Sequence, residues 1–261
     1  TSDINGNSMA PAFEEISQWN TYYVQDSTGY HQNYLNFFFA YGSHQLTLVA
    51  EREPVIIKSI ELIPYEPDAS LIKSYEEVKA EYIANGYQSA SGALENVVLQ
   101  GEFPSLVSDS SVYPTNDNSS SANFPSTPSA QLYNVIGENS YDTMGQWAAY
   151  TFTVNESGLY KIGARYLQSQ LQGMYICRAL KLTGGHYGET PTVPFVEAYD
   201  IQFNYSKEWQ SEFLSDSNGT VFELYFEKGV EYTLYLECSL GSLSKLIQRV
   251  ETSLTSINGS Y

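Results

Sequence analysis

The feature that most constrains the fold of this chain is a segment that occurs twice. The sequence WNTYYVQDSTG begins at Trp19, and WQSEFLSDSNG begins at Trp209, 190 positions later. Both fit the pattern Trp-x-x-x-aromatic-aliphatic-x-Asp-Ser-x-Gly without a gap. Asp and Gly are the residues that tight turns require. The pattern therefore predicts a turn rather than a metal site, with the Trp and the aromatic residue in a core, and it indicates two copies of one domain.

The residues that follow each copy predict strands. FFFAYGSHQLTLVA (37–50) and LYFEKGVEYTLYLEC (224–238) each read as a strand, a Gly turn and an alternating strand, which is typical of a hairpin. VIIKSIEL (55–62) predicts one more strand after the first copy. The chain has 23 Tyr, and Tyr, Val, Thr and Ile favour strands. The predicted fold class is all-β.

The two copies differ in completeness. Further strands are predicted before the second copy only, in VVLQGEF (97–103), WAAYTFTV (147–154), LYKIGARYL (159–167) and MYICRALKL (174–182). Residues 95–241 are therefore expected to form a whole β-sandwich module, and residues 1–65 the C-terminal half of another. Because half a sandwich exposes unpaired strand edges, we expect the second copy, a helix or another molecule to cover residues 1–65.

A helix is predicted in the linker between the copies, residues 66–94. In SYEEVKAEYIANG, Ser74 and Glu77 form a capping box, and Gly86 is a good stop. We expect the apolar side of this helix to pack against a domain face.

A second helix is predicted in residues 242–261, with Ser242 as N-cap and Asn258-Gly259 as the stop. Its apolar residues recur at steps of three, four and seven and form one stripe, which we expect to be buried against a domain face or a further domain: Leu243, Leu246, Ile247, Val250, Leu254 and Ile257.

Charge limits the partners. The chain carries 30 acidic and 12 basic residues, a net charge of −18. Such a field repels polyphosphates and anionic membrane surfaces, so nucleic acid is not expected as a partner, whereas a neutral sugar meets no such repulsion. Membrane insertion is not expected either, because no apolar run approaches the length of a membrane span. The acidic composition favours an extracellular or cell-surface location. Cys177 and Cys238 are either two buried thiols or a disulfide.

Catalytic motifs are lacking: the sequence has no HExxH, no GxSxG and no Gly-rich phosphate loop. Pairs of carboxylates are unavoidable among 30 acidic residues and indicate nothing specific. The chain is expected to be a binding protein and not an enzyme.

Some residues suit binding. Gln100 and Glu102 would point the same way from a strand, either as oxygen ligands for calcium or as a solvent-exposed pair. Arg165 is expected on the outer side of its strand, where it either binds hydroxyls or a carboxylate, or forms a surface ion pair. Aromatic residues beside Asn and Asp in loops suit sugar rings; the candidate ligand-binding residues are Tyr113, Asp117, Phe124, Arg165, Tyr187 and Tyr205.

The loop 108–130 discriminates between two functions. If Tyr113 and Phe124 are exposed, sugar binding is favoured. If they are buried in the core, a structural or adhesive β-sandwich that binds protein is favoured.

The second copy resembles carbohydrate-binding modules of families 6 and 35, on three segments. LQGEF (99–103) is similar to the family's opening strand, GQWAAYTFTVNESGLYKIGARY (145–166) to its Gly-x-Trp to Arg-Tyr run, and FEKGVEYTLYLE (226–237) to its Gly-turn hairpin. The resemblance implies a galactose-binding-like jelly-roll β-sandwich, repeated with an incomplete first copy.

The same resemblance implies a structural calcium held by Gln100 and Glu102, and stacking aromatics at Tyr113 and Tyr205. The family's last strand, with its Asn and Asp, is replaced here by Gly241-Ser242 and a helix, which departs from the pattern of both sites.

The tandem arrangement with a helix is similar to modular extracellular solute-binding proteins of bacterial ABC sugar importers. This likeness implies a surface-anchored glycan-capture protein with further domains in the same polypeptide and an oligo- or polysaccharide as partner.

Overall fold

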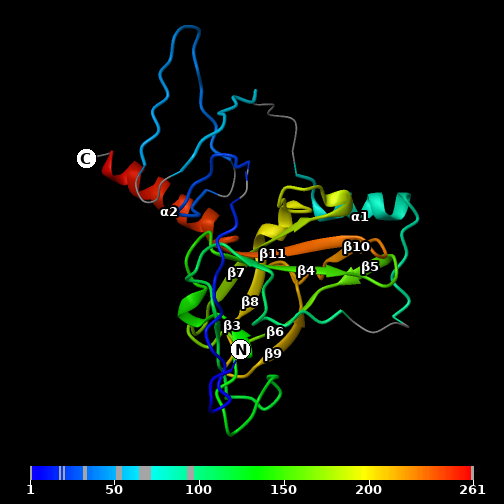
Figure 1. The fold of residues 1–261 in the computed structure, drawn as a ribbon. Coiled ribbons are helices and arrows are strands. Elements are labelled where there is room, and N and C mark those ends of the chain that lie inside the picture. The colour runs from blue at the N-terminus through cyan, green and yellow to red at the C-terminus, as the bar shows by residue number, and fades with distance from the viewer. Residues whose placement is uncertain are drawn as a thin grey trace.

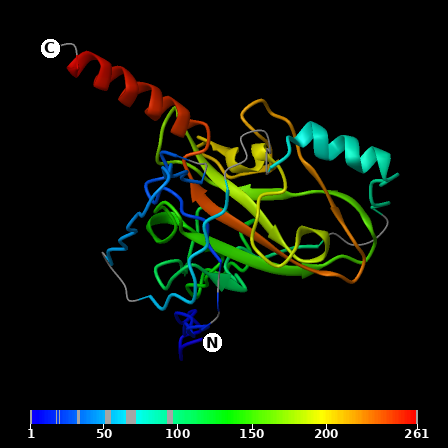
Figure 2. The same ribbon diagram turned by 90° about the horizontal axis from the view of Figure 1, so that it is seen from above.

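The computed structural model describes residues 2–17, 19, 21–31, 34–50, 55–64, 72–92 and 97–259. The chain folds into a β-rich body that carries one helix against it and a second helix that projects outward (Figures 1 and 2). The elements in chain order are α1 (Tyr75–Ala84), β1 (Leu106–Val107), β2 (Pro114–Thr115), β3 (Val135–Ile136), β4 (Trp147–Thr153), β5 (Gly158–Lys161), β6 (Gly163–Tyr166), β7 (Tyr175–Thr183), β8 (Ile201–Asn204), β9 (Gln210–Phe213), β10 (Glu223–Phe226), β11 (Glu231–Ser239) and α2 (Leu243–Asn258).

The strands form one five-stranded sheet in the order β1-β4-β11-β7-β8 and three two-stranded ribbons, β5–β10, β6–β9 and β2–β3. All of these strands pair antiparallel. The all-β class predicted from the sequence is confirmed.

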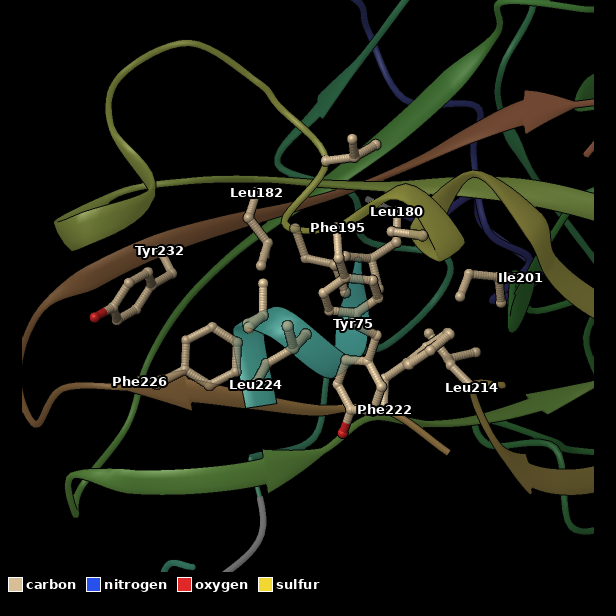
Figure 3. Close-up of a cluster of buried hydrophobic side chains, with 14 of the residues drawn as sticks. Tyr75, Leu180, Leu182, Phe195, Ile201, Leu214, Phe222, Leu224, Phe226 and Tyr232 are labelled. Atoms are coloured by element: carbon tan, nitrogen blue, oxygen red, sulfur yellow. The ribbon is translucent and has the colours of Figure 1, made fainter. Parts of the chain in front are cut away.

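The main core lies between the five-stranded sheet and the β5–β10 and β6–β9 ribbons (Figure 3). Leu180 and Leu182 of β7 point into it from the sheet, and Leu224 and Phe226 of β10 point into it from the opposite ribbon. Tyr75 of α1 completes it, with its ring centroid 4.9 Å from that of Phe222. Antiparallel layers that share such a core are sandwich-like.

Helix α1 begins as the sequence predicts. Ser74 and Glu77 form the capping box, and Gly86 follows the helix with φ +70°. Tyr75, Val78 and Tyr82 are buried in the main core. The predicted burial of the apolar side of this helix is confirmed, and α1 is part of the β-sandwich body rather than a free linker.

The predicted hairpin over 224–238 is wrong. Both strands exist, but β10 pairs with β5 while β11 pairs with β4 and β7. The turn at Gly229 carries the chain from one layer to the other. Phe226 and Tyr232 flank this turn, and their ring centroids lie 4.9 Å apart within the core. Burying both rings between two layers is incompatible with the flat pairing of a hairpin.

The predicted strand over 97–103 is also wrong. Residues 97–100 have no strand partner, and the N–H of Phe103 donates to the carbonyl of Gln100 at 3.1 Å, which closes a turn. The edge strand is β1, Leu106–Val107, which pairs with β4.

The half-sandwich predicted for residues 1–65 is not formed. Residues 34–50 and 55–64 contain no strand, and most of their large apolar side chains are exposed. A strand needs a neighbouring strand for its backbone groups. The N–H of Leu35 donates to the carbonyl of Val24 at 2.9 Å, but residues 37–50 and 55–62 pair with no strand among the described residues, so neither the predicted hairpin nor the predicted strand appears.

One part of the early segment does lie on the body. Residues 25–31 border a cavity of about 220 Å³ together with Ala179 and Lys181 of β7 and Glu237 of β11. Lys181 and Glu237 form an ion pair there at 2.5 Å. The segment thus covers part of the sheet face opposite the main core.

The repeated Asp-Ser-x-Gly segment makes the same turn in both places, as predicted. Asp26 Oδ1 accepts the N–H of Thr28 at 2.9 Å, and Asp216 Oδ1 accepts the N–H of Asn218 at 2.9 Å. Each turn ends on a glycine with positive φ, +74° at Gly29 and +77° at Gly219. The accompanying tryptophans differ from the prediction, because Trp209 is half-buried and Trp19 is exposed rather than in a core.

Helix α2 forms where predicted, with Ser242 in the N-cap position and Asn258-Gly259 at its end. Ser242 makes no capping hydrogen bond, because its hydroxyl bonds that of Tyr175 at 2.8 Å. The apolar stripe is mostly exposed, since the helix projects from the body (Figure 2); the exposed members are Leu246, Val250, Leu254 and Ile257. Burial of this stripe against a further domain stays a prediction. Neither α1 nor α2 is both long enough and apolar enough to cross a membrane, within the part of the chain that the structure describes.

Cys177 and Cys238 are free and buried, so they are two thiols and do not form a disulfide. Cys238 is paired with Arg178 in the register of β11 and β7. Cys177, next to Arg178, therefore points to the opposite face of the sheet.

Candidate functional site

The Ser/Asn/Pro-rich loop between β2 and β3 is fixed by its own polar side chains. Asn134 donates through Nδ2 to the carbonyls of Asp117 (2.9 Å) and Pro125 (3.0 Å), and its Oδ1 accepts the N–H of Asp117 at 2.9 Å. The Asp117 carboxylate accepts the N–H of Ser119 at 2.5 Å. These bonds replace the regular pairing of a strand, so a long polar segment acquires a defined shape.

Arg165 and Trp209 attach this loop to the β6–β9 ribbon. Arg165 donates through Nε to Asn123 Oδ1 (3.0 Å) and through Nη2 to Ser120 Oγ (3.1 Å). Its guanidinium lies 5.3 Å from the ring centroid of Trp209, a cation–π contact. The Trp209 ring N–H donates to Asp117 Oδ2 at 3.2 Å. The two side chains thus clamp the loop from one side.

The outward position of Arg165 is confirmed, because Lys161 and Arg165 are exposed while Tyr160, Ile162 and Tyr166 pack toward the core. Among the described residues Arg165 forms no ion pair. Its observed partners are neutral oxygens and an aromatic ring, which is the chemistry of hydroxyl and amide recognition rather than of a surface ion pair.

The other side of the loop borders a groove of about 650 Å³. This volume is within the range of small-molecule sites. The groove is lined by residues without charge: Asn7, Asn118, Ser121, Ser126, Thr127, Pro128, Ser129, Ala130 and Gln131. Amides and hydroxyls both donate and accept hydrogen bonds. Such a wall suits a neutral ligand rich in hydroxyl groups.

The predicted ligand-binding residues are divided. Asp117 and Arg165 meet through Trp209, and Phe124, which is 74% exposed, lies between groove residues in sequence. Tyr113 is 45% exposed and Tyr205 is half-buried, but neither lines the groove.

Tyr187 lies outside this assembly. Its hydroxyl donates to the Tyr225 carbonyl at 3.1 Å, and its ring packs on Phe226 in the main core, so burial raises its pKa well above the ordinary value. Tyr187 therefore packs on the core and does not line the groove, and its role in ligand binding stays a prediction.

Gln100 and Glu102 do not share a strand face, because they lie in the turn that closes at Phe103. Gln100 is exposed and Glu102 is buried, with neither carboxylate oxygen bonded to any described residue. Calcium takes six to eight oxygen ligands, and no group of three His, Cys, Asp or Glu suited to a metal occurs among the described residues. The pair does not form a calcium site by itself, and calcium binding at Glu102 stays a prediction.

Three residues of this site were not predicted: Trp209, Asn123 and Asn7. Trp209 was assigned to the core because of its repeat. The contact of Trp209 with Arg165 depends on the register of β6 and β9, in which Arg165 is paired with Ser211, and no local sequence pattern indicates this register. Nothing in the sequence indicates that Asn7 contacts a loop more than a hundred residues away.

Comparison with known proteins adds little. No protein-family model and no curated protein matches the chain. Among solved structures it is similar to a cycloisomaltooligosaccharide glucanotransferase from Paenibacillus sp. complexed with cycloisomaltoheptaose, with 15% sequence identity and a TM-score of 0.35. The match covers 66% of this chain and 22% of that chain. A likeness this weak carries no argument about fold or function.

Proposed function

We propose that this chain is a non-catalytic carbohydrate-binding module of a galactose-binding-like jelly-roll type, within a secreted or surface-anchored bacterial glycan-capture protein. In this proposal it belongs to a sugar solute-binding or glycan-degrading polypeptide with further domains. The observation that carries the proposal is the uncharged groove of about 650 Å³, walled by amides and hydroxyls, in a chain with a net charge of −18.

The composition of the groove favours a neutral oligo- or polysaccharide. A sugar offers hydroxyls that exchange hydrogen bonds with Asn118 and Gln131, and the exposed ring of Phe124 is available for stacking. An anionic glycan would meet the net negative charge without a charged partner in the lining. Module affinities in the millimolar to micromolar range correspond to roughly −4 to −8 kcal/mol.

The test is titration calorimetry of the chain with neutral and acidic glycans that an array identifies. Asn118→Ala/Gln131→Ala removes two hydrogen-bonding side chains from the groove and should weaken neutral glycan binding roughly fivefold to a hundredfold. Asn155→Ala/Gln172→Ala removes the same two residue types from exposed positions outside the groove and should bind like the wild type. Absence of saturable binding to any neutral glycan would sink the proposal.

A structural or adhesive β-sandwich that binds protein is the second candidate. The exposed apolar stripe of α2 favours it, because soluble proteins seldom leave such a face uncovered. Under this alternative the wild type binds no glycan, and substitutions in the groove change nothing that calorimetry can detect.

A further inference from the structure

The groove has a wall that comes from a distant part of the sequence. The N–H of Ser8 donates to the carbonyl of Gln131 at 2.8 Å, and the N–H of Tyr133 donates to Ser8 Oγ at 3.1 Å. The N–H of Gln131 donates to Asn7 Oδ1 at 2.8 Å. Three hydrogen bonds therefore join residues 7–8 to residues 131–133, and Asn7 lines the groove beside Gln131.

Asp3 fixes the side chain of Asn7. Its Oδ2 accepts from Asn7 Nδ2 at 2.9 Å, and its Oδ1 accepts the N–H of Asn7 at 2.9 Å and that of Asn5 at 2.8 Å. The backbone closes the same turn, with the N–H of Asp3 donating to the carbonyl of Asn7 at 2.9 Å. The Asn7 amide is thus held at both ends, by Asp3 through Nδ2 and by Gln131 through Oδ1.

We infer that residues 2–8 are an integral wall of the binding groove and that Asp3 is a positioning residue, which acts on ligand through Asn7 and Gln131. Asp3 does not line the groove, so its effect is indirect. The ligand part of this inference rests on the proposed function. The inference adds that glycan affinity depends on a carboxylate that no ligand touches.

The wall is held by hydrogen bonds and not by apolar burial. Asp3, Asn5 and Ile4 are all exposed, and Asn7 is half-buried. Because no apolar burial supports the segment and three of its hydrogen bonds end on Asp3, removal of the Asp3 acceptors should release the whole segment. The N–H groups of Gln131 and Tyr133 would then lose their hydrogen-bond acceptors on Asn7 and Ser8.

The test compares Asp3→Ala, Asp3→Asn and the control Glu14→Ala, which removes one exposed acidic side chain from the same stretch of chain. Amide hydrogen exchange at Gln131 and Tyr133 reports on the wall, and calorimetry with the neutral glycan bound by the wild type reports on the site. Asp3→Ala should speed exchange at both amides at least tenfold and weaken binding roughly fivefold to thirtyfold. Asp3→Asn should lie between, because its amide oxygen still accepts the N–H groups of Asn5 and Asn7.

Three outcomes separate the inference from the proposed function. If amide exchange at Gln131 and Tyr133 is unchanged in Asp3→Ala, the positioning role of Asp3 is overturned, whatever the glycan result. Faster exchange with unchanged affinity overturns the role of the wall in binding. If the wild type binds no glycan, the proposed function is overturned, but faster exchange in Asp3→Ala still supports the positioning of Gln131 by Asp3 through Asn7.

Discussion

Glu102 is a buried carboxylate without a hydrogen-bond partner among the described residues, and it provides a sharp prediction. The residue is 3% exposed, and both carboxylate oxygens are buried without a hydrogen-bond partner among the described residues. A buried polar group that lacks a partner costs about 1–3 kcal/mol, and an apolar group of similar shape removes that cost. Glu102→Met should therefore raise the free energy of unfolding at pH 7 by about 1–3 kcal/mol.

The gain should depend on pH in a defined direction. Burial raises the pKa of Glu102 above its usual range. Glu102 consequently keeps its proton to higher pH in the folded state than in the unfolded state. The contribution of Glu102 to stability therefore falls as pH rises from the ordinary glutamate value, about 4.3, through the raised value. Glu102→Met should match the wild type most closely below pH 4 and exceed it most above the raised pKa.

Urea unfolding between pH 3.5 and 8 measures this difference. The shape-matched Glu102→Gln cannot titrate at this position and should lose the part of the pH dependence that Glu102 contributes. Glu189→Met, at an exposed position, should change neither stability nor its pH profile. A Glu102→Met protein less stable than the wild type at pH 7 in EDTA would refute the reasoning.

The same measurement decides the calcium prediction. A cation bound at Glu102 would stabilise the folded wild type in proportion to the logarithm of its concentration. With millimolar calcium the order would then reverse, and the wild type would become more stable than Glu102→Met. Equal stability of the wild type in calcium and in EDTA would remove calcium from this position.

Two further predictions concern the turns and the root of α2. Asp216→Ala removes acceptors for the N–H groups of Asn218 and Thr220 in a turn whose Asp is buried, and should cost about 1–2 kcal/mol in urea unfolding, whereas Asp26→Ala in the matching turn should cost less because its segment adds little core; equal losses would contradict this. Gly241→Ala should cost more than about 2 kcal/mol, because its Cβ would overlap Asp200 Oδ1 and Cys177 Sγ at a φ of +54°. Gly229→Ala has a φ of +73° and open space, so thermal unfolding should show only a strain of about 1 kcal/mol, and a larger loss there than at Gly241 would count against the overlap.

Local chemistry was read correctly from the sequence wherever a few neighbouring residues determine it. The capping box of Ser74 and Glu77 needs only one helical turn, and the Asp-Ser-x-Gly turns at Asp26 and Asp216 need only five residues or fewer. The central strands β4, β7 and β11 also appear where alternation predicts them. For the helix cap and the turns the deciding interactions lie within the segment itself, whereas the three strands are indicated by their alternation and held by their neighbours.

Pairing was not predictable in the same way, because it depends on distant residues. The alternation of 224–238 is the same whether its strands pair with each other or with β5 and β4. A turn between Gln100 and Phe103 forms in place of the strand expected at 97–103. The segment 55–62 has no neighbouring strand among the described residues. Register and partner choice are properties of the whole sheet.

The candidate site follows the same division. Composition alone indicated that the loop 108–130 matters, and Asp117 and Arg165 were identified as polar residues in suitable positions. Trp209 and Asn7 complete the site by contacts across about 90 and 120 residues, which no local pattern reveals.

The two buried cysteines can report on local opening of the folded structure around them. Burial raises the pKa of Cys238 to about 11 and raises that of Cys177 also, so neither thiol is ionised or accessible in the folded state. Cys177 lies against Gly241 at the root of α2, while Cys238 packs beside Tyr141 in a cluster near β1. When a thiol reagent is added to the native chain, the labelling rates of Cys177 and Cys238 therefore report how often each of these two places opens. If one thiol is labelled long before the other, the root of the helix and the edge of the sheet open as separate events.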